Sequence, residues 1–211
     1  MPRTVTAGRL AGFLLRDGIS EARIREIAVG KEEWTALDVL RLDGVPAADR
    51  LWAVLREDFI DAPALHEFAC RCAEQALAAL PEGKRDPRCE SAIAAKRAWL
   101  RGGTDDAGMK AARDAARIAA EAAWYTTGPS GAEEAAAKAA ACAALPGAAW
   151  AARKAAAWSA EVATCYAHED AYEAIWESAR KAQISMLAGM LEAGTSDGGQ
   201  PAGGAPEGGT P

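Results

Sequence analysis

The sequence has no apolar run long enough to cross a membrane. A spanning helix needs about 18 or more consecutive apolar residues. Charged residues such as Arg153, Lys154 and Glu161 interrupt even the alanine-rich stretches. The N-terminal stretch MPRTVTAGRLAGFLL also lacks the long apolar run and small-residue cleavage site of a secretory signal. We therefore expect no membrane span and a cytoplasmic protein.

Cysteine and histidine are both scarce. The 211 residues include five cysteines, an odd number at unrelated spacings, and two histidines. A chain of this length can bury an adequate core without disulfides, so we expect free thiols in a reducing compartment. His66 and Cys70 share a helical face, with Cys72 nearby, but no second ligand pair completes a zinc site. We expect buried thiols here, with no metal and no other cofactor.

Motifs of the common chemistries are missing too. The chain has no phosphate-binding glycine loop, no dinucleotide fingerprint and no serine nucleophile elbow. The stretch HED at residues 168–170 resembles half of a zinc-protease motif, but Tyr172 stands where the second histidine belongs. Helix caps and helix ends explain the carboxylates Glu57, Asp58 and Asp61. We expect no catalytic residues and a non-enzymatic role.

Helix start and stop signals account for most of the first half, and almost nothing is left for strands. Asp61 and Asp86 are each followed by a proline in the first helical turn, which is a typical helix start. Glycines or prolines close most of these segments. We expect helices over residues 10–15, 20–28, 34–42, 46–58, 61–80 and 86–101.

Alanine dominates the second half. Nearly half of the residues between Ala107 and Ala163 are alanine, the best intrinsic helix former. The stretch TTGPSG at 126–131 and the pair Pro146 and Gly147 break this region into long helices. The last of them is expected to run from 148 to 192, with a kink or irregular turn within TCYAHED.

The large side chains of that last helix follow one seam. At 100° per residue they fall within roughly 40° of Trp158, and they are Trp158, Cys165, Tyr172, Trp176 and Leu187. We interpret this seam as core and expect Trp158→Ala to cost roughly 3 to 5 kcal/mol. Trp150 lies roughly 80° away, so it is the better candidate for contact with a partner.

The expected fold is all-α, with short N-terminal helices packed on long helices rich in alanine and tryptophan. Residues 1–30 form an N-terminal helical extension and residues 31–193 the main domain. Residues 194–211, GTSDGGQPAGGAPEGGTP, contain no large apolar side chain. Such a segment cannot offset the entropy of ordering, so we expect a disordered tail rich in glycine and proline.

The net charge of −6 is unevenly distributed. Residues 1–104 are neutral, whereas residues 105–193 hold twelve acidic and eight basic side chains. An acidic surface disfavours nucleic acid and favours a basic protein as the partner. The candidate contact residues are Trp124, Trp150, Arg153, Lys154 and Tyr166.

Three stretches carry a resemblance to a known family. They are DRLWAVLRED (49–58), FACRCAE (68–74) and AKRAWLRG (95–102), followed by alanine-rich helices dotted with tryptophan and tyrosine. In this order, over about Trp34 to Leu191, the chain resembles the bacterial and phage-associated immunity proteins. The resemblance implies an all-helical protein that neutralises a toxin by binding it, without catalysis. A phage-borne copy would turn the same surface against a host defence complex.

Two other classes of function stay open at this point. A structural or assembly protein would self-associate, which a concentration-dependent mass measurement would reveal. An enzyme would need a concave site that gathers Glu57, Asp58, His66 or Cys70. A three-dimensional structure can test that gathering.

Overall fold

A computed structural model of the chain describes residues 3–16, 20, 24, 31–127, 131–165 and 168–196. These residues are overwhelmingly helical, which confirms the expected all-α class. The elements are β1 (Thr4–Thr6), α1 (Ala7–Arg16), β2 (Glu33–Thr35), α3 (Ala36–Leu40), α4 (Ala47–Val54), α5 (Ala62–Ala78), η1 (Glu82–Lys84), α6 (Pro87–Leu100), α7 (Asp106–Thr127), α8 (Ala132–Ala143), α9 (Ala148–Thr164), η2 (Glu169–Ala171) and α10 (Tyr172–Ser196).

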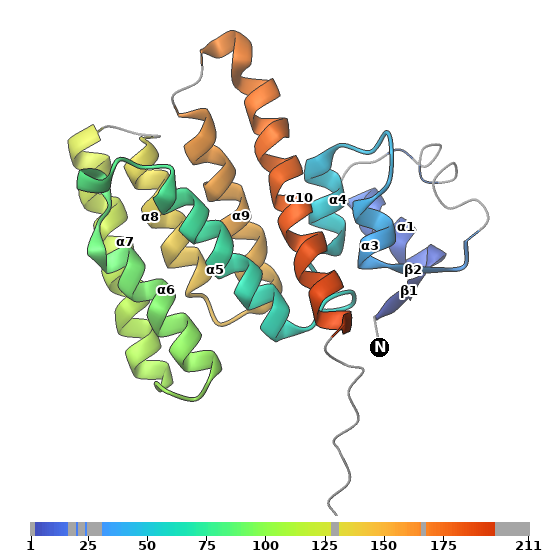
Figure 1. Ribbon diagram of the computed structural model, residues 1–211, viewed down its shortest axis with the longest axis horizontal. Helices are drawn as coiled ribbons and strands as arrows, with labels where there is room; N and C mark the ends of the chain where they lie inside the picture. The colour runs from blue at the N-terminus through green and yellow to red at the C-terminus, as the bar shows by residue number, and fades with distance from the viewer. Residues whose placement is uncertain are drawn as a thin grey trace, which may run out of the picture.

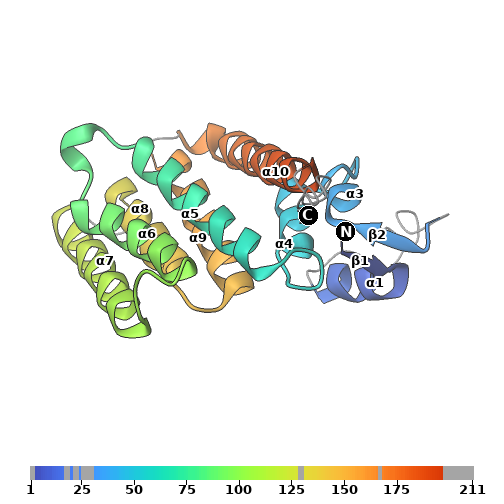
Figure 2. The same cartoon turned by 60° about the horizontal axis from the view of Figure 1, so that its bottom comes forward.

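Helices α5 to α9 form a bundle, and α10 joins it to the smaller N-terminal part of the molecule (Figure 1). Within the bundle, α9 packs on both α5 and α8, and α7 packs on α6 and α8. Helix α10 contacts α9 on one side and α3 and α4 on the other, as Figure 2 also shows. None of the helices in the described ranges combines the length and apolarity that a membrane span requires.

The N-terminal part contains a short sheet that the sequence did not indicate. Strands β1 and β2 pair antiparallel, with Val5 opposite Trp34. Trp34 was expected to begin a helix, but it is buried on β2, and Thr35 instead caps α3 through a capping box with Asp38. Strands of three residues are too short to show an alternating pattern. The domain boundary expected after residue 30 therefore lies, along the sequence, between two strands that pair with each other.

The second expected helix, over residues 20–28, lies almost wholly outside the described residues. Only Ser20 and Ile24 are described there, and the Ile24 amide donates to the Ser20 carbonyl at 3.0 Å. Two other helix starts are confirmed. Asp61 accepts a hydrogen bond from the Ala64 amide at 2.8 Å, and Asp86 accepts one from the Arg88 amide at 2.9 Å.

Alanine forms most of the contact surface between α8 and α9. Both helices bury a continuous face of alanines, Ala135, Ala136, Ala139, Ala140 and Ala143 on α8 and Ala148, Ala151, Ala152, Ala155, Ala156 and Ala160 on α9. Faces this small let helix backbones approach closely. Larger apolar side chains enter the same core from neighbouring helices, for example Leu65 and Phe68 of α5. The alanine-rich half is therefore a packed core.

The long final helix expected over 148–192 is interrupted at TCYAHED, where a kink or irregular turn was expected. It is two helices, because α9 ends at Thr164 and α10 begins at Tyr172 after a 3-10 turn. The change of direction breaks the predicted seam, and of its members only Leu187 is fully buried. Trp158 is half-buried and Tyr172 is exposed, so these aromatic side chains are not the core. Helix α10 continues to Ser196, and residues 197–211 of the expected tail lie outside the described residues.

We expect the alanine face of α9 to tolerate no enlargement. Ala155 is fully buried between α9 and its neighbours, whereas Ala163 is exposed on the same helix. Ala155→Leu should lower the free energy of unfolding by roughly 1 to 3 kcal/mol, because a larger side chain must push the helices apart. Ala163→Leu, the matched control, should change it by less than about 0.5 kcal/mol. Urea denaturation of both variants makes the comparison, and equal losses would contradict an alanine-dependent core.

Candidate partner-binding surface

The groups considered for catalysis or metal binding have structural roles. Asp58 pairs with Arg9 and Asp61 caps α5. His66, Cys70 and Cys72 are all buried in α5. Burial raises the pKa of Cys70 to about 11, and that of Cys72 rises further, so both thiols stay protonated at neutral pH. Over the described ranges, no three metal-ligating side chains come together.

A buried cation fastens the end of α8 to the rest of the bundle. Lys96 of α6 is fully buried, and its Nζ donates to the Leu145 carbonyl, just beyond α8, at 2.8 Å. Its Nζ also lies 4.1 Å from the ring centre of Trp99. A cation here balances the carbonyls left unpaired where α8 ends. Burial lowers the pKa of Lys96 to about 8, so the ammonium form persists at neutral pH.

His66 of α5 lies beside this lysine. Its ring meets the Trp99 ring edge-on at 5.9 Å, and it shares a hydrogen bond with the Pro146 backbone. His66 and Lys96 together therefore hold the turn between α8 and α9. Among the described residues, the buried Nδ1 atom of His66 has no hydrogen-bond partner. Burial, and secondarily the charge on Lys96, lower the pKa of His66 to about 4, so the ring is neutral at pH 7.

Arg153, one of the five predicted contact residues, serves an intramolecular purpose. Its guanidinium donates to the carbonyls of Leu55 at 3.0 Å and Trp52 at 2.8 Å, and it lies over the Trp52 ring at 4.6 Å. Arg153 thus caps the C-terminal end of α4 from α9. The prediction that it faces a partner is corrected on this point. The sequence could not show that α4 lies against α9, about a hundred residues away in the chain.

Trp150 is exposed, with the half-buried Lys154 beside it, and their contact with a partner stays a prediction. Trp150 is 53% exposed, and the Lys154 Nζ lies 4.6 Å from its ring centre. About two helical turns beyond Trp150 on α9, the ring of Trp158 is covered by Lys138 of α8, whose Nζ lies 4.3 Å from the ring centre. The two indoles therefore line the outer edge of the α8–α9 contact. Tyr166, another candidate contact residue, lies outside the described residues.

Trp124 lies on α7, and its surroundings include two exposed residues that the sequence did not single out. Trp124 is 44% exposed and meets the ring of Tyr125 edge-on at 4.9 Å. Tyr125 is 80% exposed, and Ile118, seven residues earlier on α7, is 49% exposed. A groove of about 690 Å³ runs between α7 and α8 beside Trp124, with Ala120, Ala141, Cys142 and Leu145 in its lining.

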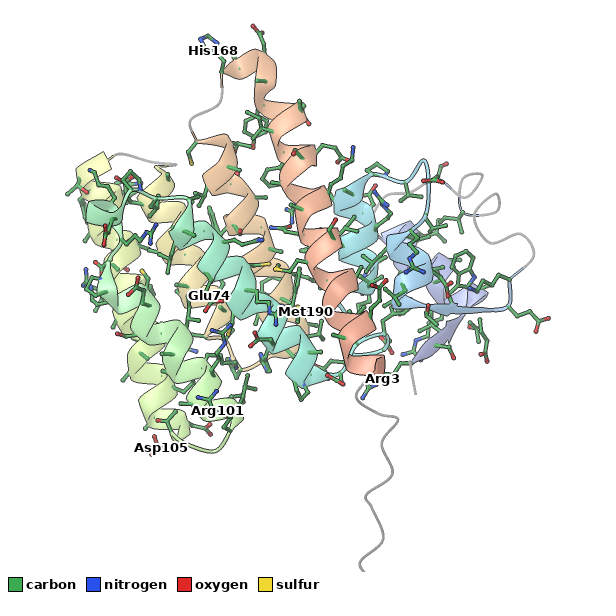
Figure 3. All side chains as sticks on the ribbon, in the orientation of Figure 1. Arg3, Glu74, Arg101, Asp105, His168 and Met190 are labelled. Atoms are coloured by element: carbon green, nitrogen blue, oxygen red, sulfur yellow. The ribbon has the colours of Figure 1, made fainter. Side chains whose placement is uncertain are left out.

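The acidic excess of the second half is concentrated where α9 passes into α10. No lysine or arginine occurs between Lys154 and Arg180, although five carboxylates do, Glu161, Glu169, Asp170, Glu173 and Glu177. His168 marks the free tip of this corner in Figure 3. Glu169, Asp170 and Glu173 are exposed there and have no ion-pair partner among the described residues. We call this surface, with Tyr172 at its centre, the acidic tip.

Aromatic rings extend the acidic tip down α10. Tyr172 is 37% exposed and stacks on Trp176, with ring centres 6.2 Å apart and planes 10° from parallel. The Arg180 guanidinium lies 4.5 Å from the Trp176 ring centre and donates to Gln183 at 3.2 Å. Because Arg180 is buried against the bundle, this row of stacked groups holds Tyr172 in a defined position at the surface.

Comparison with known proteins finds no matching protein family, no matching curated protein and no matching solved structure.

We expect the stability of the protein to fall in mild acid because of His66. Its pKa is about 6.5 in an unfolded chain and about 4 here, so the unfolded state binds the extra proton between these values. The free energy of unfolding should drop by about 2 kcal/mol between pH 7 and pH 5. Urea denaturation at both pH values measures the drop. His66→Gln should flatten it, and an unchanged drop in that variant would contradict this assignment.

The two tryptophans of α9 should differ in their contribution to stability. Trp158 packs against the core and beneath Lys138, whereas Trp150 is mostly exposed. Because Trp158 is only half-buried, Trp158→Ala should cost roughly 2 kcal/mol, less than the sequence suggested, and Trp150→Ala less than about 1 kcal/mol. Thermal and urea denaturation provide the values. Equal losses would show that Trp150 is also part of the core.

Proposed function

We propose that this protein acts without catalysis, by binding a basic surface of another protein at the acidic tip. The observation that carries this proposal is the set of carboxylates of Glu169, Asp170 and Glu173, which are exposed and have no ion-pair partner among the described residues, in a stretch without lysine or arginine. Carboxylates that no internal cation neutralises attract a basic partner over several ångströms. Such attraction accelerates association and sets the orientation of docking.

Tyr172 supplies an anchor within that charge. Large aromatic side chains near the centre of an interface commonly contribute most of its binding energy. Tyr172 is already stacked on Trp176, so little side-chain freedom remains to be lost on binding. Carboxylates around a pre-positioned ring form a surface that fits a groove lined with lysine and arginine.

The bundle beneath the tip supports an inhibitor that binds without changing shape. Helix α10 is tied to α9 by Gln183, whose side-chain amide donates to the Ala156 carbonyl at 2.9 Å. The alanine contacts and the buried Lys96 hold the remaining helices in place. A preformed surface pays less conformational entropy on binding than one that must order itself.

The partner we propose is a toxin with a basic substrate cleft, which the acidic tip would block. The stretches DRLWAVLRED, FACRCAE and AKRAWLRG, which resemble those of immunity proteins, support this choice. A nuclease is the toxin class with the best charge match, because its cleft must attract phosphate groups. A host defence component with a basic surface would be bound by the same contacts.

Charge reversal at the acidic tip tests the proposal. The partner to use is the product of the neighbouring reading frame. Glu169→Lys, Asp170→Lys and Glu173→Lys together should lower the association rate constant at least about tenfold, because the tip would then repel a basic surface. For the unmodified protein, the association rate should fall as salt is added. Stopped-flow or surface-based kinetics measures both effects.

A second triple variant is the control. Glu57→Lys, Glu82→Lys and Glu90→Lys change the net charge equally at exposed positions outside the tip, and binding should be nearly unaffected. Equal losses in both triple variants would show that only net charge matters. An absence of both binding and inhibition when the two wild-type proteins are mixed would rule out the inhibitor function.

A further inference from the structure

Helix α7 lies at the outer edge of the bundle and leaves one long face uncovered (Figures 1 and 2). Its main packing partners are α6 and α8. The described structure exposes six large apolar side chains, and three of them, Ile118, Trp124 and Tyr125, lie on α7. Several exposed apolar residues on one helix are typical of an interaction surface, whereas single ones are ordinary.

The charged residues of this face balance one another. Around the groove between α7 and α8, Arg113, Arg117 and Lys138 face Asp114, Glu121 and Glu134. This face is therefore neutral, unlike the acidic tip. A strongly basic or acidic partner gains little from a neutral face. A second copy of the chain is a better match, because two copies can meet here without the repulsion expected from a net charge of −6.

The sequence of α7 complements itself when it is reversed. Over residues 113–125 it reads RDAARIAAEAAWY, in which only alanines separate the larger side chains. An antiparallel pairing centred at the level of Ala119 places position 117 opposite 121 and position 113 opposite 125. Arg117 of each copy then meets Glu121 of the other copy, so the pairing contains two of these contacts. Arg113 of one copy meets the exposed ring of Tyr125 of the other, an arrangement that favours a cation–π contact.

The two groups that form the ion pairs of this contact are exposed. Arg117 and Glu121 pair with each other along the helix, and their side chains remain 60% and 55% exposed. Both can therefore exchange partners with a second copy at little desolvation cost. The alanines between them let the two helices approach closely. A two-fold pairing uses the same patch on both copies, as most homodimers do.

We propose that two copies of this protein associate antiparallel through the outer face of α7, with Arg117 and Glu121 paired between copies and Trp124 and Tyr125 packed at the two ends. One helix on each side makes a small interface, so the dimer is weak and reversible. The acidic tip lies at the α9–α10 corner, outside this contact. The dimer thus stands independently of the proposed binding function.

Sedimentation of the purified full-length chain tests the dimer without any other partner. Over about a hundredfold range of concentration the average mass should rise from monomer to dimer. Arg117→Glu and Glu121→Arg, each alone, should weaken self-association at least about tenfold, because like charges then meet across the two-fold axis. An equimolar mixture of these two variants should associate again as a heterodimer. Such rescue requires positions 117 and 121 to face each other.

Control variants separate this contact from general effects of charge. Glu177→Arg and Lys181→Glu change an ion pair of the same spacing on α10 and should leave the dimer unchanged. Trp124→Ser with Tyr125→Ser, at exposed positions that the fold does not need, should weaken it about tenfold. A wild-type chain that stays monomeric overturns the proposal. A dimer that the α7 variants leave unchanged would also overturn it. So would single variants that are folded by circular dichroism but do not associate when they are mixed.

Discussion

The close approach of alanine-faced helices is the constraint on which the rest of this structure depends. Helices α8 and α9 pack together, each burying a face made mostly of alanines, and α5 packs against both. An alanine contributes little buried area, but it lets two backbones come nearer than leucine or phenylalanine would. Two backbones packed so closely together leave no space for an indole between them. The tryptophans of this half are therefore displaced to helix edges and outer faces, where Trp124, Trp150 and Trp158 are found.

Long polar side chains form the hydrogen bonds between segments that alanine, with its single methyl group, cannot form. Three of them donate to backbone carbonyls on other elements: Lys96 to Leu145 just beyond α8, Arg153 to Trp52 and Leu55 at the end of α4, and Gln183 to Ala156 in the middle of α9. Each of these side chains joins segments far apart in the sequence. A buried polar group that is hydrogen-bonded in this way defines one arrangement of helices, because any other arrangement would leave it unsatisfied. The rigidity that a preformed binding surface needs thus comes from polar contacts as much as from apolar packing.

The division of charge between two surfaces gives the molecule two different kinds of contact. The acidic tip carries carboxylates without cations, and it fits a basic partner of another kind. The outer face of α7 carries equal numbers of both charges beside exposed aromatic rings, and it fits a surface like itself. Both surfaces depend on the same scaffold, since α7 and α10 are held at its edges by the alanine core.

Much of the fold could be predicted from local chemistry. The caps Asp61 and Asp86, the breaks at TTGPSG and at Pro146 and Gly147, and the all-α class follow from residues within a few positions of one another. The candidate surface was predicted less well. Trp124 and Trp150 are exposed and Lys154 is half-buried beside Trp150, whereas the Arg153 guanidinium is hydrogen-bonded to the end of α4. The carboxylates of the acidic tip are neighbours in the sequence, but the exposure of the tip and of Tyr125 was not predicted. Their exposure depends on which helices cover them, which no periodicity reveals.

The sequence by itself determined that this chain forms helices, where most of them begin, and that it carries its acidic excess in the second half. Those properties arise from intrinsic propensities, short-range hydrogen bonds and composition. Only the tertiary structure decided that the aromatic seam would be divided between two helices and that alanine would form the core in its place. It also decided that the carboxylates of the acidic tip, which are neighbours in the sequence, would remain exposed at one corner. These outcomes depend on distances between segments remote in sequence, and packing alone sets such distances.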